Sequence, residues 1–153
     1  MIPVKVKEIV MDQSHNPLLL LVDMKEQDVL PVGIGFWEAQ AIALKLKGQS
    51  SPRPMTHDLM GMICGELGAR VEKIEIYDVY EDTFYANIYL EKEKEGEEVI
   101  VDARPSDAIA LAMTVGASIY LSNRMSAYTV SAGDLVIENE EDEENGEEGP
   151  TLH

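Results

Sequence analysis

Two short stretches, Ala41-Ile42-Ala43-Leu44 and Ala108-Ile109-Ala110-Leu111, carry the same four residues at an offset of 67 positions. The same offset, without gaps, aligns further identical pairs: Val4 with Val71, Glu8 with Glu75, Ile9 with Ile76, Lys25-Glu26 with Lys92-Glu93, and Val32 with Val99. Ten identities over the 41 positions from Val4 to Leu44 thus share one register. We infer two copies of one structural unit, related by a pseudo-two-fold axis.

The residues around each tetrapeptide predict three strands followed by helical structure. The expected strands of the first copy are 4–10, 17–24 and 28–35, and the expected helices are 37–47 and 56–68. The expected elements of the second copy are strands 71–79, 83–90 and 97–103, helix 105–115, an extended segment 118–121 and a final helix 123–130 capped by Ser122. Glycines at 48, 68 and 116 end three of these helices.

Short turns between successive strands favour antiparallel pairing. We therefore expect an α+β fold, an internally duplicated β-β-β-α-(α) unit with mainly antiparallel sheet covered by helices. The chain of 153 residues suits one domain, predicted at 1–137, with repeats at about 3–68 and 70–135. Residues 138–153 are predicted to be a disordered acidic tail, because they are acidic and poor in apolar groups.

Composition limits the possible locations and partners. The longest apolar run near the start, Leu18 to Val22, is far shorter than the roughly 20 residues of a membrane-spanning helix. The N-terminus lacks a secretory pattern, and the single cysteine, Cys64, excludes an internal disulfide framework. We therefore expect a cytoplasmic protein that does not enter the membrane. A homodimer is plausible, because closed two-fold assemblies are common among soluble proteins.

The charge of the chain bears on nucleic-acid binding. There are 12 Lys and Arg against 29 Asp and Glu, a net charge of −17, and eight of the acids lie between Glu138 and Glu148. A duplex-binding surface usually shows a basic patch, and no basic run occurs here. DNA or RNA binding must therefore depend on a few arginines and lysines or on bridging cations.

Two motifs concentrate polar groups where an irregular segment or a strand leads into a helix. They are Arg53-Pro54-Met55-Thr56-His57-Asp58-Leu59 and Val101-Asp102-Ala103-Arg104-Pro105-Ser106-Asp107-Ala108. Helix N-termini present free N–H groups and partial positive charge, which suit phosphate or carboxylate ligands. Pro105 fits the first helical position, where its missing N–H costs nothing.

A structural interpretation of both motifs is also open. Thr56 is a good N-cap, and Asp58, Ser106 and Asp107 suit the first turn of a helix. Arg104 can simply pair with a carboxylate, and His57 can donate to a carbonyl. The aromatic pair Phe36-Trp37 is predicted to belong to the core, and Met60, Met62 and Cys64 to pack along a helix.

The two motifs, together with Gly35-Phe36-Trp37-Glu38-Ala39-Gln40-Ala41-Ile42-Ala43, resemble the bifunctional nuclease domain family. The resemblance runs from about Val4 to Leu121, and the stretch from Asp102 to Ala112 is specific to the family pattern. It implies a duplicated α+β fold and nuclease activity toward both DNA and RNA.

Under this nuclease hypothesis the site residues take specific roles. The candidate catalytic residues are His57, Asp58, Asp102, Arg104 and Asp107. His57 serves as general base or acid, and Arg104 holds the phosphate in a bidentate fork. The candidate substrate-binding residues are Arg53, Thr56 and Ser106. Asp58, Asp102, Asp107 and Glu38 are candidate ligands of Mg²⁺ or Mn²⁺, because hard cations prefer carboxylates.

A second hypothesis is a non-catalytic binding or regulatory module that recognises an anionic ligand or a protein partner. The acidity of the chain favours this module, because negative charge repels nucleic acid. A purely structural subunit is a third, weaker alternative. Cleavage of single-stranded DNA or RNA that a chelator abolishes distinguishes the enzyme from the other two.

Overall fold

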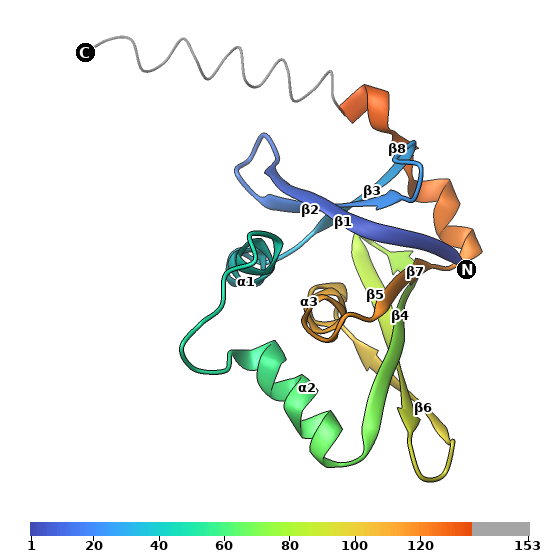
Figure 1. Cartoon of the computed structure of the whole chain (residues 1–153). Coiled ribbons are helices and arrows are strands. Elements are labelled where there is room, and N and C mark those ends of the chain that lie inside the picture. The colour runs from blue at the N-terminus through green and yellow to red at the C-terminus, as the bar shows by residue number, and fades with distance from the viewer. Residues whose placement is uncertain (136–153) are drawn as a thin grey trace.

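The computed structural model describes residues 1–135, and the predicted acidic tail at 138–153 lies outside them. Within the described part, eight strands form one sheet in the order β6-β5-β4-β7-β1-β2-β3-β8 (Figure 1). The strands are β1 (Ile2–Met11), β2 (Pro17–Asp23), β3 (Asp28–Gly33), β4 (Ala69–Tyr80), β5 (Thr83–Lys92), β6 (Glu98–Ala103), β7 (Ser118–Leu121) and β8 (Val130–Ser131). Every neighbouring pair is antiparallel except β4 with β7. The expected α+β class with a mainly antiparallel sheet is confirmed.

Short β7 lies in the middle of the sheet, between the two groups of three strands. Counting outward from it, β1, β2 and β3 follow on one side and β4, β5 and β6 on the other. Each group of three is followed in the chain by a helix, α1 (Phe36–Leu46) or α3 (Pro105–Val115). The element after that helix differs between the two halves. It is helix α2 (Thr56–Glu66) in the first half and strand β7 in the second.

Helices α1, α2 and α3 lie on one side of the twisted sheet, as Figure 1 shows. Helix α3 lies between the two groups of strands and packs against β4, β5, β7, α1 and α2. Its central residues Ala108, Ile109, Ala110, Leu111 and Ala112 are all buried. This side of the sheet and the helices share one large apolar core, which also takes Leu19 and Leu21 of β2 and Ile74 and Ile76 of β4.

Within residues 1–135, the other face of the sheet also carries a covered apolar cluster, at β2 and β3. Because successive strand residues point to opposite faces, Leu20 and Val22 point away from the helices. They form a second, smaller cluster with Val29, against which Ala132 and Leu135 pack. The chain reaches this cluster after the 3₁₀-helix η1 (Asn123–Tyr128) and strand β8.

The expected helix at 123–130 is therefore only partly correct. A short 3₁₀-helix forms instead, and the chain then becomes extended and pairs with β3. Ser122 occupies the capping position, but its hydroxyl donates to the carbonyl oxygen of Tyr77 at 2.9 Å. This contact joins η1 to β4 and satisfies a hydroxyl that would otherwise lie half-buried without a partner.

The prediction that Phe36 and Trp37 are core residues is wrong. Their exposed fractions are 54% and 76%. Helix α1 turns Ala39 and Ile42 toward the core, and the two aromatic residues lie in its first turn on the outer side. Met62 is likewise exposed, whereas Met60 packs against the core as expected.

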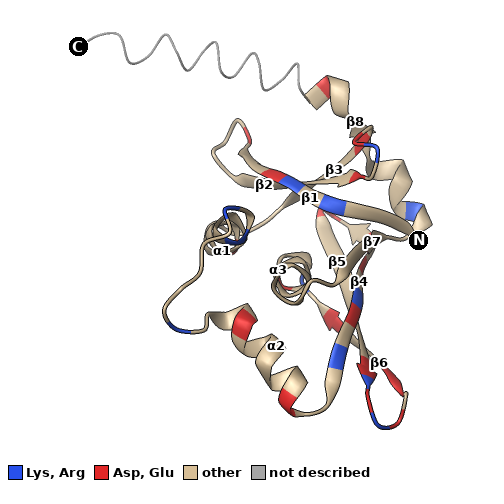
Figure 2. Cartoon of the chain, viewed as in Figure 1, with Lys and Arg blue, Asp and Glu red and all other residues tan. Residues whose placement is uncertain are grey.

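Charge is dispersed over the described surface. Basic and acidic residues are both present along β1 and β4, and acids gather at the turn between β5 and β6 (Figure 2). Across residues 1–135, none of the helices has the length and apolar character needed to cross a membrane. The cytoplasmic location and the homodimer stay predictions.

Candidate functional site

Helix α1 brings a carboxylate to the start of the candidate site. Gly35 is the N-cap of this helix in an extended conformation, and Glu38 lies in its first turn. The Glu38 carboxylate folds back over Gly35, where a side chain of any other residue would collide with it. One carboxylate oxygen, Oε1, accepts a hydrogen bond at 3.1 Å from the Arg104 guanidinium. Glu38 thereby joins α1 to the start of α3.

Helix α2 begins at Thr56 and places His57 and Asp58 in its first turn. Thr56 is the first helical residue, so the preceding Met55 takes the capping position that was predicted for Thr56. Asp58 Oδ2 accepts a hydrogen bond from the Met55 N–H at 3.0 Å, and Asp58 Oδ1 accepts one from Lys45 Nζ at 3.1 Å. The Met55 N–H bond first, and the Lys45 ammonium second, lower the pKa of Asp58. The Lys45 contact ties the end of α1 to the start of α2.

Helix α3 begins with Pro105 in its first position, as predicted, and Arg104 immediately before it. The N–H of Arg104 Nε donates to Asp107 Oδ2 at 2.8 Å within this first turn. Arg104 and Asp107 are three residues apart, a spacing that brings side chains to the same side of a helix start. The Asp107 hydrogen bond, with the Glu38 contact behind it, raises the pKa of Arg104 above its already high value.

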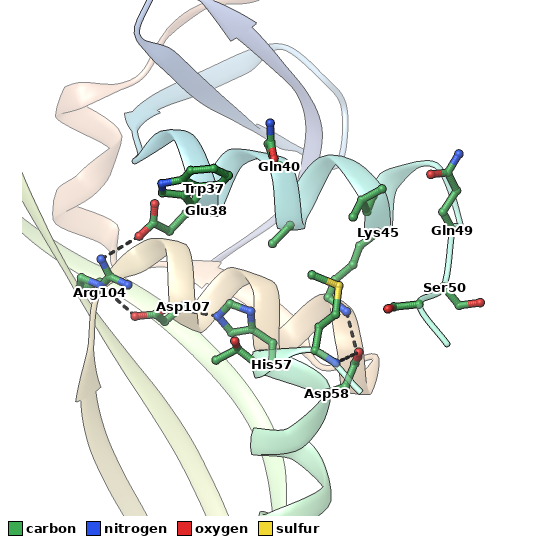
Figure 3. A pocket seen from close by; sticks show the side chains of 15 residues that line it. Trp37, Glu38, Gln40, Lys45, Gln49, Ser50, His57, Asp58, Arg104 and Asp107 are labelled. Atoms are coloured by element: carbon green, nitrogen blue, oxygen red, sulfur yellow. Dashed lines mark hydrogen bonds and ion pairs between the residues drawn. The ribbon is translucent and has the colours of Figure 1, made fainter. Parts of the chain in front are cut away.

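Asp107 connects two helices through its two carboxylate oxygens. Oδ2 accepts from Arg104, and Oδ1 lies 3.0 Å from Nε2 of His57, fifty residues earlier in the chain. Figure 3 shows Glu38, Arg104, Asp107 and His57 as one continuous chain of contacts. Burial acts to raise the pKa of Asp107, but the hydrogen bonds from Arg104 and His57 outweigh it, so this pKa is lowered.

The carboxylate fixes which ring nitrogen of His57 carries hydrogen in the neutral imidazole. Ionised Asp107 offers only lone pairs, so Nε2 of His57 must be the N–H donor. The lone pair of the neutral ring is then on Nδ1, which has no hydrogen-bond partner among residues 1–135. His57 is itself buried, so the ring has little freedom to reorient. Such a carboxylate-held imidazole is suited to proton transfer.

These side chains line one cavity of about 530 Å³ between α1, α2 and the start of α3. The volume lies in the range of small-molecule sites, roughly 300–1,000 Å³. Its polar wall contains Glu38, Lys45, His57, Asp58, Arg104 and Asp107, and its apolar wall contains Trp37, Ala41, Leu44 and Met55. The structure thus brings six predicted residues to one cavity: Glu38, Thr56, His57, Asp58, Arg104 and Asp107.

Three predicted residues do not line this cavity. Asp102 pairs across the sheet with Asn87, whose neighbours Ala86 and Ile88 enter the core. Asp102 therefore faces the opposite side, where its carboxylate accepts a weak hydrogen bond from the Tyr77 hydroxyl at 3.4 Å. Ser106 lines a neighbouring cavity that also contacts Arg104, and Arg53 lies exposed in the loop before α2.

The predicted metal ligands do not form a cluster in this structure. Among residues 1–135 there is no group of three His, Cys, Asp or Glu side chains placed to hold a metal ion. Asp102 is on the far face, and the carboxylates of Asp58, Asp107 and Glu38 are engaged by Lys45 or Arg104. This donor set, as arranged, does not fit Mg²⁺ or Mn²⁺, which take several free oxygens.

Lys45 and Trp37 also line this cavity, although they were not among the predicted site residues. A signal for Trp37 was present, because Trp37, Ala41 and Leu44 follow a helical spacing that differs from that of Ala39 and Ile42. Two separate faces of α1 were therefore apolar. No sequence signal identifies Lys45, which reaches Asp58 only because α2 begins beside the end of α1.

Comparison with known proteins yields a family and several relatives. A family model described as the bifunctional nuclease domain matches residues 19–131. Uncharacterized proteins from two strains of Mycobacterium tuberculosis are 40% identical over 142 residues, which cover 92% of this chain and 81% of theirs. Bifunctional nuclease 1 of Oryza sativa subsp. japonica is 25% identical over 113 residues, which cover 73% of this chain and 34% of the rice protein.

Proposed function

The chain belongs to the bifunctional nuclease domain family, and from that premise we propose that it hydrolyses phosphodiester bonds in DNA, RNA or both. The observation that carries the proposal is the placement of Asp107, whose carboxylate holds an imidazole on one side and a guanidinium on the other. A proton acceptor and a phosphate-binding group thereby share one cavity wall. The name of the rice relative, bifunctional nuclease, supports the same chemistry.

The proposed reaction assigns one role to each of the three residues. Nδ1 of His57 accepts a proton from a water molecule, and the water oxygen attacks phosphorus. The guanidinium of Arg104 binds the non-bridging phosphate oxygens, where negative charge increases in the transition state. One phosphorus–oxygen bond breaks, the departing oxygen takes up a proton from solvent, and the protonated imidazole returns its proton to solvent. Asp107 keeps the imidazole in the required tautomer and stabilises it once it is protonated.

Negative charge in the cavity opposes phosphate binding. Arg104 is already bonded to Glu38 and Asp107, so a phosphate must share its N–H groups with two carboxylates. Participation of Mg²⁺ or Mn²⁺ stays a prediction, and since the carboxylates do not form a ligand set, no step of the reaction above is assigned to a metal.

Cleavage assays on the purified full chain test this proposal. Labelled single-stranded DNA and RNA are incubated with the protein in Mg²⁺, in Mn²⁺ and in excess chelator. Replacing His57 with Gln removes the proton acceptor while keeping a similar volume, and should lower cleavage about 100-fold or more. Arg104→Lys should also lower cleavage, because an ammonium cannot form the bidentate contact.

Control variants outside the cavity test whether a loss of cleavage is specific to the site. His15 lies in the turn between β1 and β2 with a positive φ that Asn tolerates, so His15→Asn should leave cleavage unchanged. Asp102→Asn tests the sequence-based assignment of Asp102, and we expect retained cleavage because this residue faces the other side of the sheet. Equal cleavage by the wild type and the His57→Gln variant would refute the proposed role of His57.

A folded protein that cleaves neither substrate under any of these conditions would contradict the nuclease proposal. The alternative, a binding or regulatory module for an anionic ligand or a protein partner, would then account for the same cavity.

A further inference from the structure

Trp37 is among the most exposed large apolar side chains of residues 1–135. Its exposed fraction is 76%, and it lies in the first turn of α1, on the side away from the buried Ala39 and Ile42. The Phe36 ring meets it edge to face, with ring centroids 5.5 Å apart and an angle of 75° between the planes. A single T-shaped contact of this kind leaves at least one face of the indole free of Phe36. Cavities that bind ligands are commonly lined by apolar and aromatic side chains.

The position of Trp37 relative to the polar cluster suggests what it binds. Trp37, Ala41 and Leu44 form the apolar side of the cavity on α1, with Met55 at the start of α2. Glu38 follows Trp37 directly in the chain and bonds to Arg104 (Figure 3). A flat apolar surface and a guanidinium therefore lie at the same end of one cavity. A nucleotide has the matching pair of groups, an aromatic base and a phosphate.

The charges that line the cavity suggest that the nucleobase, and not only the phosphate, contributes to the binding affinity. Three carboxylates and two cationic side chains line it, so phosphate attraction alone gives little affinity. Stacking of a base on an aromatic ring does not depend on net charge and accepts every base, since each has a π face. A base already stacked on both sides within a duplex cannot also stack on Trp37 unless it is flipped out.

We propose that Trp37 is a stacking platform for an unpaired nucleobase whose phosphate lies at Arg104, so that the substrate class is single-stranded nucleic acid. This inference rests on the proposed nuclease function and adds to it the part of the substrate that lies beside the scissile phosphate. Affinity then depends mainly on stacking and only weakly on salt, in contrast to proteins that bind through basic patches.

Intrinsic fluorescence tests the platform directly, because Trp37 is the single tryptophan of the chain. The full chain is titrated with adenosine monophosphate, with ribose 5-phosphate and with a short oligonucleotide in single-stranded and duplex form, all in excess chelator. We expect saturable quenching by the monophosphate and the single strand. Ribose 5-phosphate, which lacks a base, and the duplex should quench little. Equal quenching by the single strand and the duplex would overturn the proposal.

Substitutions provide a second measurement that does not need Trp37 emission. Binding of a labelled single strand is followed by anisotropy at low and high salt. Trp37→Ala should weaken binding about tenfold, an effect within the range of single base-stacking contacts, and Trp37→Phe should restore part of it. Leu67→Ala is the matched control, because Leu67 is 79% exposed beyond the end of α2 and does not line the cavity. Unchanged binding by Trp37→Ala would refute the platform.

The two proposals can fail separately. Base-dependent binding without cleavage would reject the nuclease function and leave the platform in place. Cleavage without quenching, or equal cleavage of duplex and single strand, would reject the platform alone. Emission that changes with protein concentration and not with nucleotide would assign the exposed indole to contact between two copies of the chain, and would also overturn the proposal.

Discussion

The two copies of Ala-Ile-Ala-Leu form helices in very different surroundings. In α3, all four residues from Ala108 to Leu111 are buried, and Leu111 is 2% exposed. In α1, Ile42 is fully buried, but Leu44 is 36% exposed and lines the candidate site. The difference comes from the layer outside each helix. Helix α3 has α1 and α2 around it, whereas the outer side of α1 faces the cavity.

This comparison shows how a repeated sequence can provide both a core helix and a site helix. Both copies of the tetrapeptide lie in helices, and the isoleucine of each is fully buried. Whether the leucine at the end of the tetrapeptide is buried or lines a cavity depends on which distant elements pack beside the helix. The outer side of α1 remained available for Trp37, Ala41 and Leu44, and this apolar side is what the proposed platform uses.

The largest expected difference is between Leu111→Ala and Leu44→Ala. The first leaves a cavity inside the core and should lower the free energy of unfolding by about 2–5 kcal/mol. The second removes a side chain that is partly in water already, and should cost less than about 1 kcal/mol. Urea denaturation of both variants measures the difference. Equal losses would mean that α1 and α3 are covered to the same degree.

A smaller difference is expected between two glycines of α2, the helix that covers α3. A Cβ at Gly65 would meet nothing within 4 Å, so Gly65→Ala should stabilise the protein by about 0.5–1 kcal/mol through helix propensity. A Cβ at Gly61 would lie 3.0 Å from Cγ1 of Val115 in α3. Gly61→Ala should therefore be less stable than Gly65→Ala by about 1 kcal/mol. Thermal unfolding compares them, and the reverse order would show that α2 does not pack closely on α3.

A pH-dependent effect is expected at the start of α3, where Asp107 holds both Arg104 and His57. The pKa of Asp107 is below its ordinary value of 3.8, because those two hydrogen bonds outweigh burial. A carboxylate with a lowered pKa contributes stability above pH 3.8, and this contribution is lost as the pH falls through the lower folded value. The stability of the wild type relative to Asp107→Asn should therefore be constant near neutrality and shrink below pH 3.8. A stability difference that does not change with pH would contradict an ionised Asp107 that binds both Arg104 and His57.

The smallest expected effect concerns the far end of α1. Lys45 and Asp58 form a pair at 3.1 Å, with side chains 20% and 35% exposed. Water screens such a pair, so Lys45→Gln should change the free energy of unfolding by less than about 1 kcal/mol, and less at high salt. Lys47→Gln is the control, since Lys47 is exposed and forms no ion pair within residues 1–135. A large loss on Lys45→Gln would make this pair a main attachment of α2.

Local sequence signals were accurate where the outcome depended on local geometry. Pro105 begins α3, and Gly48, Gly68 and Gly116 follow helix ends with positive φ, as the glycine positions predicted. Arg104 and Asp107 meet because they are three positions apart at the start of a helix. The same local signals could not place Asp102 and Ser106, which are next to these residues in the motif. The alternation of β6 turns Asp102 to the opposite face, and Ser106 points to a neighbouring cavity.

Local sequence patterns could not predict the order of the strands in the sheet. The segment 118–121 was correctly expected to be extended, but its place as β7 between β4 and β1 depends on hydrogen bonds to residues more than forty positions away. The repeat boundaries near 3–68 and 70–135 stay a prediction. The common order of three strands and a helix in both halves agrees with them.

The sequence by itself determined the α+β class, most helix and strand positions and the polar motifs at the helix starts, because periodicity, caps and turns act over a few residues. Only the tertiary structure decided that Asp107 meets His57, that Arg104 meets Glu38, and that Trp37 stays exposed. Those outcomes depend on which distant elements cover each helix. Burial and long-range hydrogen bonds are properties of the packed chain, and no short segment encodes them alone.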